Sequence, residues 1–236
     1  WYPDIENAVE ALCSYDPPVQ PQRNPRLRER FALYKKIYTD LKKDLMYHCV
    51  SNMLKTYRIE DEKRNEILNI VPLLTDYTQD VRDIKRFLNS IMSVLYYFSN
   101  EQNKRLAMQL NICDYIIIEL IKRENRELYS IIWKNATYFV SADRETMFGR
   151  EGYLQANQEK KNAETKDFYK KLFSSEKNSQ YINLLKRIFP YVDHYVRERN
   201  NIISKDYTDE DYEQAIKKHR IYSGNYFPIY FTLHGN

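Results

Sequence analysis

The 236-residue chain contains 4 glycines, 8 prolines and 22 tyrosines, with 43% hydrophobic residues and a formal net charge of +4. An average protein of this length has roughly sixteen glycines, so few residues here suit left-handed turns or phosphate-cradling loops. This composition argues against β-sandwiches, β-barrels and Rossmann or P-loop cores, and the hydrophobic content excludes wholesale disorder. The small positive charge indicates nucleic-acid affinity only where cations cluster.

Residues 1–25 are predicted to form an N-terminal segment that ends in a proline-rich linker. Four prolines lie within residues 16–25, and each fixes its own φ and lacks a backbone donor. The chain begins at Trp1 rather than at a methionine, so we expect it to be part of a longer polypeptide.

The next segment is predicted to form a long helix over residues 26–57. An apolar stripe recurs in steps of three and four at Leu27, Phe31, Tyr34, Ile37, Leu41, Leu45, Cys49 and Met53. Basic residues interleaved with tyrosines can follow a nucleic-acid backbone and stack bases. The candidate nucleic-acid contacts are Arg26, Arg28, Arg30, Lys35 and Lys36, in a basic run that continues to Lys42 and Lys43. Acidic residues dilute this run, which favours a solvated helix face over a nucleic-acid site.

Two further helices are predicted before residue 100. A short one over residues 61–71 is expected to end at Pro72, and a longer one is expected to start after Asp80 as its N-cap. At 100° per residue the apolar face of the longer helix consists of Ile84, Phe87, Leu88, Ile91, Leu95 and Phe98. The opposite face carries Arg82, Lys85, Arg86 and Asn89.

The rest of the chain is also predicted to be helical. A helix over about 104–134 is nearly encircled by apolar residues, which indicates a central core position. The polar residues 143–166 are expected to form a loop and a solvated helix. An amphipathic helix over 181–189 stops at a proline, and a capping box opens another helix over 208–219. The aromatic tail 226–231 is expected to be proline-broken and to dock on the bundle.

The predicted fold is therefore all-α, an irregular multi-helix bundle with at most a short extended pair. We expect the linker 1–25, a helical subdomain over 26–100 and a C-terminal helical domain over 101–236. The three cysteines are widely spaced and odd in number, so neither a disulfide framework nor a metal site is expected, and a cytoplasmic, reducing compartment fits. No apolar stretch is long enough to span a membrane.

The run Ile116–Glu119 imitates a Walker B element, because apolar residues there end in a carboxylate. A P-loop requires G-x-x-x-x-G-K-[ST], and the chain has no such motif. The run also lies within a helical periodicity, so we interpret it as part of a core helix.

Residues 80–90, with the sequence DVRDIKRFLNS, resemble the R-D-[IV]-K-R-F-[IL]-N signature of KAP-family P-loop NTPases, a family that includes bacterial phage-exclusion proteins. Residues 117–129 are similar to the family's apolar L-E-L-I-R…L-Y helix. The tail 226–231 is similar to its closing aromatic element. The resemblance covers residues 70–132 well and the tail loosely.

The resemblance implies a role for the helix after Asp80. In the family this helix follows a nucleotide-binding core, and it resembles the lid of AAA+-type ATPases, where an arginine senses the γ-phosphate. Arg82 is the corresponding residue, with Lys85 and Arg86 beside it. An arginine fork binds phosphate well, and a helix N-terminus adds a favourable dipole and free amides.

The implied protein is a bacterial, cytoplasmic anti-phage NTPase of which this chain is the C-terminal regulatory or assembly part. ATP and Mg²⁺ would be held mainly by an upstream core of the same polypeptide, so the chain alone is not expected to be catalytic. The family also implies a homo-oligomer or a partner within a defence system.

Two alternatives stay open. Arg187 and His194 satisfy the loose R-x(4–6)-H spacing of helical HEPN ribonucleases, although Pro190 interrupts the helix that should present both residues. Together with the basic run, this keeps a nucleic-acid-binding or RNase domain as one alternative. A helical protein-interaction scaffold without a nucleotide is the other.

Overall fold

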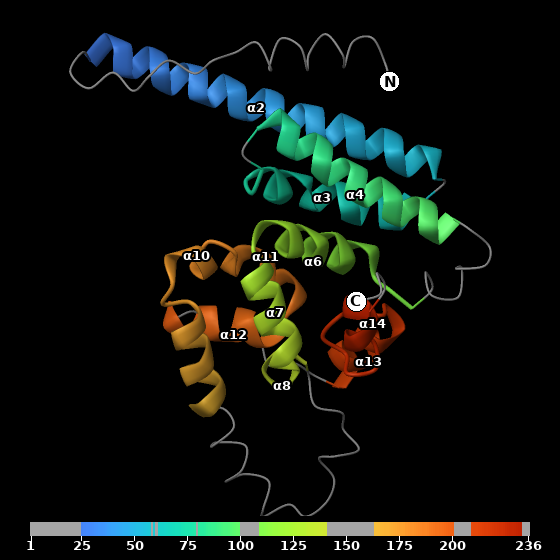
Figure 1. The fold of residues 1–236 in the computed structure, drawn as a ribbon. Helices are drawn as coiled ribbons and strands as arrows, with labels where there is room; N and C mark the ends of the chain where they lie inside the picture. The colour runs from blue at the N-terminus through green and yellow to red at the C-terminus, as the bar shows by residue number, and fades with distance from the viewer. Residues whose placement is uncertain are drawn as a thin grey trace, which may run out of the picture. The chain divides into compact units, whose positions relative to one another are not determined.

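The computed structural model of the chain describes residues 25–57, 59, 61–78, 80–99, 109–140, 163–200 and 209–232. These residues form α-helices joined by turns, without a β-strand among them, which confirms the predicted all-α class. The chain divides into two compact units, one within residues 1–100 and the other within residues 101–236. Figure 1 shows the helices of both units.

In the first unit, helices α3 (Asp61–Thr75) and α4 (Val81–Ser99) pack against α2 (Pro25–Thr56). The helix predicted over 26–57 is thus present. It begins at a proline, which is well tolerated there because an N–H at the first position of a helix has no intrahelical partner. Apolar side chains from all three helices form the core, among them Met46, Val50, Leu54, Ile67, Ile70, Val71, Leu74, Ile84, Phe87, Ile91 and Leu95.

The apolar stripe of α2 is buried only in part. Leu45 is buried, but Ile37 and Leu41 are 46% and 48% exposed. Among the described side chains of α2, those that are buried lie between Lys42 and Leu54. The N-terminal half of the helix extends past α3 and α4 (Figure 1), so those two helices leave it uncovered.

Helix α3 does not end at Pro72, contrary to the sequence prediction, and continues to Thr75. Pro72 is exposed, so water can solvate the carbonyl group that loses its intrahelical hydrogen bond. Val71 and Leu74 are buried on either side of it. Burial of these side chains outweighs the cost of the proline.

The second unit consists of short helices. They are α6 (Ile112–Glu124), α7 (Arg126–Lys134), α8 (Ala136–Phe139), a helical segment over 163–172, α10 (Glu176–Ser179), α11 (Ile182–Ile188), α12 (Pro190–Arg199), α13 (Asp209–Lys217) and α14 (Phe227–Thr232). Helix α6 has the predicted core position, since all of its residues from Asp114 to Ile118 are buried, as are Leu120 and Ile121.

The single helix predicted over 104–134 is wrong for residues 112–134, where α6 and α7 are separate helices. Asn125 ends the first helix, with its N–H donating to the Ile121 carbonyl, and caps the second, with its Oδ1 accepting from the Leu128 N–H at 3.1 Å. Its amide nitrogen donates to Asn178 Oδ1 at 3.0 Å. Asn125 therefore ends α6, caps α7 and binds Asn178, so the chain turns a corner here and does not continue as one helix.

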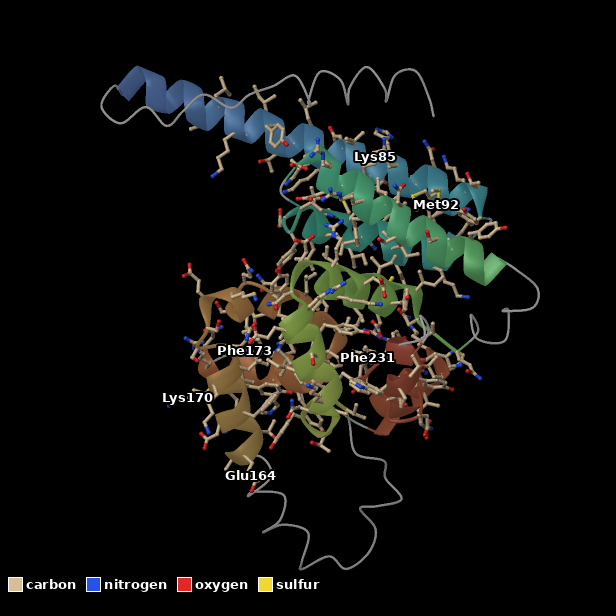
Figure 2. All side chains as sticks on the ribbon, in the orientation of Figure 1. Lys85, Met92, Glu164, Lys170, Phe173 and Phe231 are labelled. Atoms are coloured by element: carbon tan, nitrogen blue, oxygen red, sulfur yellow. The ribbon has the colours of Figure 1, made fainter. Side chains whose placement is uncertain are left out.

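The aromatic tail docks within the second unit, as predicted, but it is a helix and not a proline-broken segment. Pro228 lies in the first turn of α14. Proline is tolerated there, because an N–H in the first turn would have no intrahelical partner. The Phe231 ring, labelled in Figure 2, stacks on Trp133 of α7 with ring centroids 5.1 Å apart. Tyr230 is buried and donates to the His219 carbonyl at 2.6 Å.

Several sequence predictions lie partly outside the described residues. The N-terminal linker is outside them up to residue 24, and the polar loop over 143–166 is described only from residue 163, where it is helical. Thr208 of the predicted capping box is also outside, although α13 begins at the next residue. Helix α11 ends before Pro190 as expected, and α12 begins at this proline.

Candidate functional site

Helix α4 starts with the predicted cap. The Asp80 carboxylate accepts a hydrogen bond from the Asp83 N–H at 2.8 Å, and the Asp80 carbonyl accepts from the Ile84 N–H at 3.1 Å. Asp83 adds a second carboxylate in the first turn. Both acidic groups interact favourably with the positive end of the helix dipole. The helix terminus therefore offers fewer free amides to an external phosphate than the sequence suggested.

Lys42 of α2 holds the turn that leads into α4. It is buried, and its ammonium group donates to the Thr78 carbonyl. Burial lowers the Lys42 pKa, although the nearby carboxylates of Asp76, Asp80 and Asp83 oppose this shift. A charged donor in a buried position fixes the turn more strongly than a neutral one. The start of α4 is thereby tied to α2.

The outward side of α4 carries Arg82, Lys85 and Arg86, which we call the α4 cationic face. All three are exposed, whereas the neighbouring Ile84 and Phe87 are buried. From Arg82 to Arg86 the helix rises about 6 Å, so three positive groups lie within two turns. The sequence predicted this segregation, and no described side chain buries these cations.

The same side of α4 becomes apolar toward the C-terminus. Asn89 is exposed, and Met92 and Tyr96 are 42% and 69% exposed. Figure 2 labels Lys85 and Met92 along this helix. The outward face thus combines cations that suit phosphate with apolar surface about two turns further along.

The α4 cationic face is suited to weak, transient binding of phosphate. Arginine offers a planar fork of donors that matches two phosphate oxygens. Exposed ion pairs are weak in water, because both partners remain hydrated. A phosphate on this face would therefore bind firmly only if another group also held its ligand.

The basic run of α2 is less continuous than its sequence. Lys35 and Lys36 are exposed, but Lys42 is buried and Lys43 lies 3.8 Å from Asp76. The expectation of a solvated basic face is therefore wrong at Lys42. Helix positions 26, 28 and 30 belong to α2, while the side chains of Arg26, Arg28 and Arg30 are outside the described part of the structure.

The HEPN-like pair is split between two helices. Arg187 lies in α11 and His194 in α12, with Phe189 between the two helices as C-cap of one and N-cap of the other. The Arg187 carbonyl accepts a hydrogen bond from Arg220, and His194 Nδ1 lies 3.7 Å from a carboxylate oxygen of Glu198. The helix that would have to present both residues of a HEPN-like pair is interrupted at Pro190, as the sequence predicted.

The Walker-B-like run lies in a core helix, as the sequence analysis favoured. Ile116 to Ile118 are buried within α6. Glu119 is half-buried and accepts a hydrogen bond from the Tyr115 hydroxyl at 3.1 Å. This carboxylate lies within a helix and does not follow a strand, so it lacks the setting of a metal-binding Walker B residue.

The sequence analysis placed Lys42 in the basic run but did not predict that it is buried and bonded to the backbone. The signal was its place among Leu45, Met46 and Val50, which are three, four and eight residues away and share its side of the helix. A lysine in such a set is expected to reach a polar partner when it is buried. The partner, the Thr78 carbonyl, is 36 residues away in the chain.

Within the described residues, no three histidine, cysteine or acidic side chains are grouped so that they could hold a metal ion. Nor does any helix in that part of the chain have the length and apolar character needed to cross a membrane. Comparisons with protein-family models, curated proteins and solved structures give no match for this chain.

Proposed function

We propose that this chain is the helical regulatory domain of a KAP-like P-loop NTPase, in which the α4 cationic face contacts the phosphates of a nucleotide. A core elsewhere in the same polypeptide would hold ATP and Mg²⁺. Binding and release of the γ-phosphate at Arg82 would couple the nucleotide state to assembly or to a partner. A bacterial anti-phage role follows from the family resemblance.

One observation carries this proposal: three exposed cations lie within two turns of α4, opposite its buried side. They belong to the segment 80–90 that resembles the KAP signature. Lys42 and the Asp80 cap hold the start of this helix. A sensor requires such a rigid base, because a phosphate contact is productive only when its geometry is pre-set.

The proposal is tested in the polypeptide that carries the nucleotide-binding core. Arg82→Ala is expected to lower the rate of MgATP hydrolysis about tenfold or more, because a hydrogen bond to a charged group is worth about 1.5–3 kcal/mol. Arg126→Ala, at an exposed position in the second unit, is the matched control and should leave turnover unchanged.

Two results would contradict the assignment to a KAP-like NTPase. One is a polypeptide without a G-x-x-x-x-G-K-[ST] loop upstream of this chain. The other is MgATP turnover by this chain alone that survives repeated purification and follows its concentration. If Arg82→Ala leaves both nucleotide affinity and turnover unchanged, an interaction scaffold becomes the better account.

Nucleic-acid binding is a second candidate, and one observation favours it. Lys35 and Lys36 are exposed on the half of α2 that α3 and α4 leave uncovered. The double variant Lys35→Gln, Lys36→Gln should weaken binding to single-stranded RNA. The slope of log K against log salt concentration should also become shallower, because about two fewer counterions are released on binding. Binding that is independent of salt, or unchanged in this variant, would exclude the candidate.

A further inference from the structure

The N-terminal half of α2 has an exposed apolar stripe. Leu33, Ile37 and Leu41 are 56%, 46% and 48% exposed and recur every four residues, so they share one side of the helix. We call residues 25–41 the α2 arm. The arm is about 25 Å long at 1.5 Å per residue, and α3 and α4 do not cover it (Figure 1).

An arm of this kind needs a partner. Most of the stability of helices in proteins comes from the packing of an amphipathic face. No described side chain of the arm is buried. The exposed stripe is thus the surface through which the arm would gain stability.

The leucines of the stripe and two charged residues that flank it are placed symmetrically about Ile37. An apolar residue lies four positions away in either direction, at Leu33 and Leu41. A charged residue lies seven positions away in either direction, and the two charges are opposite, Arg30 and Asp44. All five positions belong to α2 and fall on one side of it.

We infer that the α2 arm pairs with the arm of a second copy of this chain, antiparallel, about a two-fold axis near Ile37. In that arrangement Leu33 lies opposite Leu41 of the partner subunit, and the two Ile37 side chains meet at the axis. Arg30 lies opposite Asp44 of the partner subunit, and the symmetry repeats this pair. An interface of this type is isologous, so the same patch serves both subunits.

Charge selects this arrangement over a parallel one. Within one helix, Arg30 and Asp44 are about 21 Å apart along the axis, so they cannot pair with each other. A parallel, in-register pairing would set arginine against arginine and aspartate against aspartate, which is unfavourable. The antiparallel arrangement alone satisfies both charges and both leucines. This inference does not depend on the proposed nucleotide role.

The first test measures the oligomeric state by sedimentation velocity across a range of micromolar concentrations. The chain is expected to form a dimer that dissociates on dilution. Ile37→Glu should raise the dissociation constant roughly 100-fold, since it places a charge at the two-fold axis. Ala32→Glu, at an exposed position on another side of the arm, should change it little. Circular dichroism should show an unchanged helix content for both variants.

The second test is a charge exchange. Arg30→Asp and Asp44→Arg should each raise the dissociation constant roughly tenfold, because each turns two attractive pairs into repulsive ones. The double variant carrying both changes should restore the original value. A chain that is monomeric at all concentrations would overturn the inference. The stripe would then be covered by another segment of the polypeptide or by another protein. A dimer that the double variant fails to restore would overturn the antiparallel pairing.

Discussion

His219 is the non-glycine residue with a positive φ among those described, at 51°. It follows α13, where the His219 N–H donates to the Ile216 carbonyl and the Arg220 N–H donates to the Ala215 carbonyl. This pattern is a Schellman C-cap, in which glycine is the usual residue. The His219 carbonyl then accepts from the Tyr230 hydroxyl and the Asn111 N–H, at 2.6 and 3.3 Å. The left-handed turn thus connects α13 to α6 and α14.

Replacing His219 separates the backbone effect from the side-chain effect. His219→Gly and His219→Ala both remove the ring, which packs against Tyr226 at 4.6 Å. The glycine variant should be more stable than the alanine variant by about 1 kcal/mol, because only alanine has a Cβ that opposes a left-handed conformation. Urea unfolding of the two variants measures the difference, and equal stability would argue against a strained cap.

Lys42 provides a second prediction for a single residue. Lys42→Met should lower the free energy of unfolding by about 1–3 kcal/mol, because the buried Thr78 carbonyl loses its donor. Lys43→Met is the matched control: its ion pair with Asp76 is partly exposed, so the loss should stay under about 1 kcal/mol. Thermal unfolding followed by circular dichroism distinguishes the two. Equal losses would mean that the Thr78 contact adds nothing.

Asn125 shows how one side chain joins elements. It is buried, caps α7, and donates to Asn178, whose own amide donates to the Leu172 carbonyl at 3.2 Å. The corner between α6 and α7 is therefore fixed to α10. Such a network contributes stability only when every member is satisfied.

Asn125→Ala is expected to lower the free energy of unfolding by about 2–4 kcal/mol, because it removes a cap and leaves a buried partner unsatisfied. Asn135→Ala is the comparison. Its side chain makes one hydrogen bond, to the Ile131 carbonyl, and gives no side-chain cap to α8. That variant should lose about 1 kcal/mol. Similar losses for both would contradict the proposed link to Asn178.

The regular elements could be predicted from the sequence, whereas the long-range ones could not. The two sides of α4 follow from a steady 3.6-residue period, which places Ile84 inside and Arg82 outside whatever the helix packs against. The corner at Asn125 depends on Asn178, which is 53 residues later. The burial of Lys42 depends on a carbonyl 36 residues later. Pairings at such separations leave no periodic signal.

At the scale of the whole molecule, buried tyrosines make stability depend on alkaline pH. Burial raises the pKa of Tyr115, Tyr169 and Tyr230 above the ordinary value of 10, and raises that of Tyr129 to about 12. A raised pKa in the folded state means that unfolded chains lose these protons first as the pH rises. Stability should therefore be unaffected by them below pH 10 and fall between pH 10 and 12.

Tyrosinate absorbance followed together with circular dichroism checks this expectation. The buried tyrosines should ionise together with the loss of helix, while exposed ones ionise earlier. Ionisation of all tyrosines near pH 10 in a chain that is still helical would contradict it.

The proposed role of the α4 cationic face is tested most directly by nucleotide affinity. In the longer polypeptide that would carry the proposed nucleotide-binding core, the dissociation constants of MgATP and MgADP are compared by calorimetry for the native protein and for Arg82→Ala. If Arg82 contacts the γ-phosphate, the variant should bind MgATP about tenfold more weakly or worse and MgADP equally well. An unchanged ratio of the two constants would contradict the account.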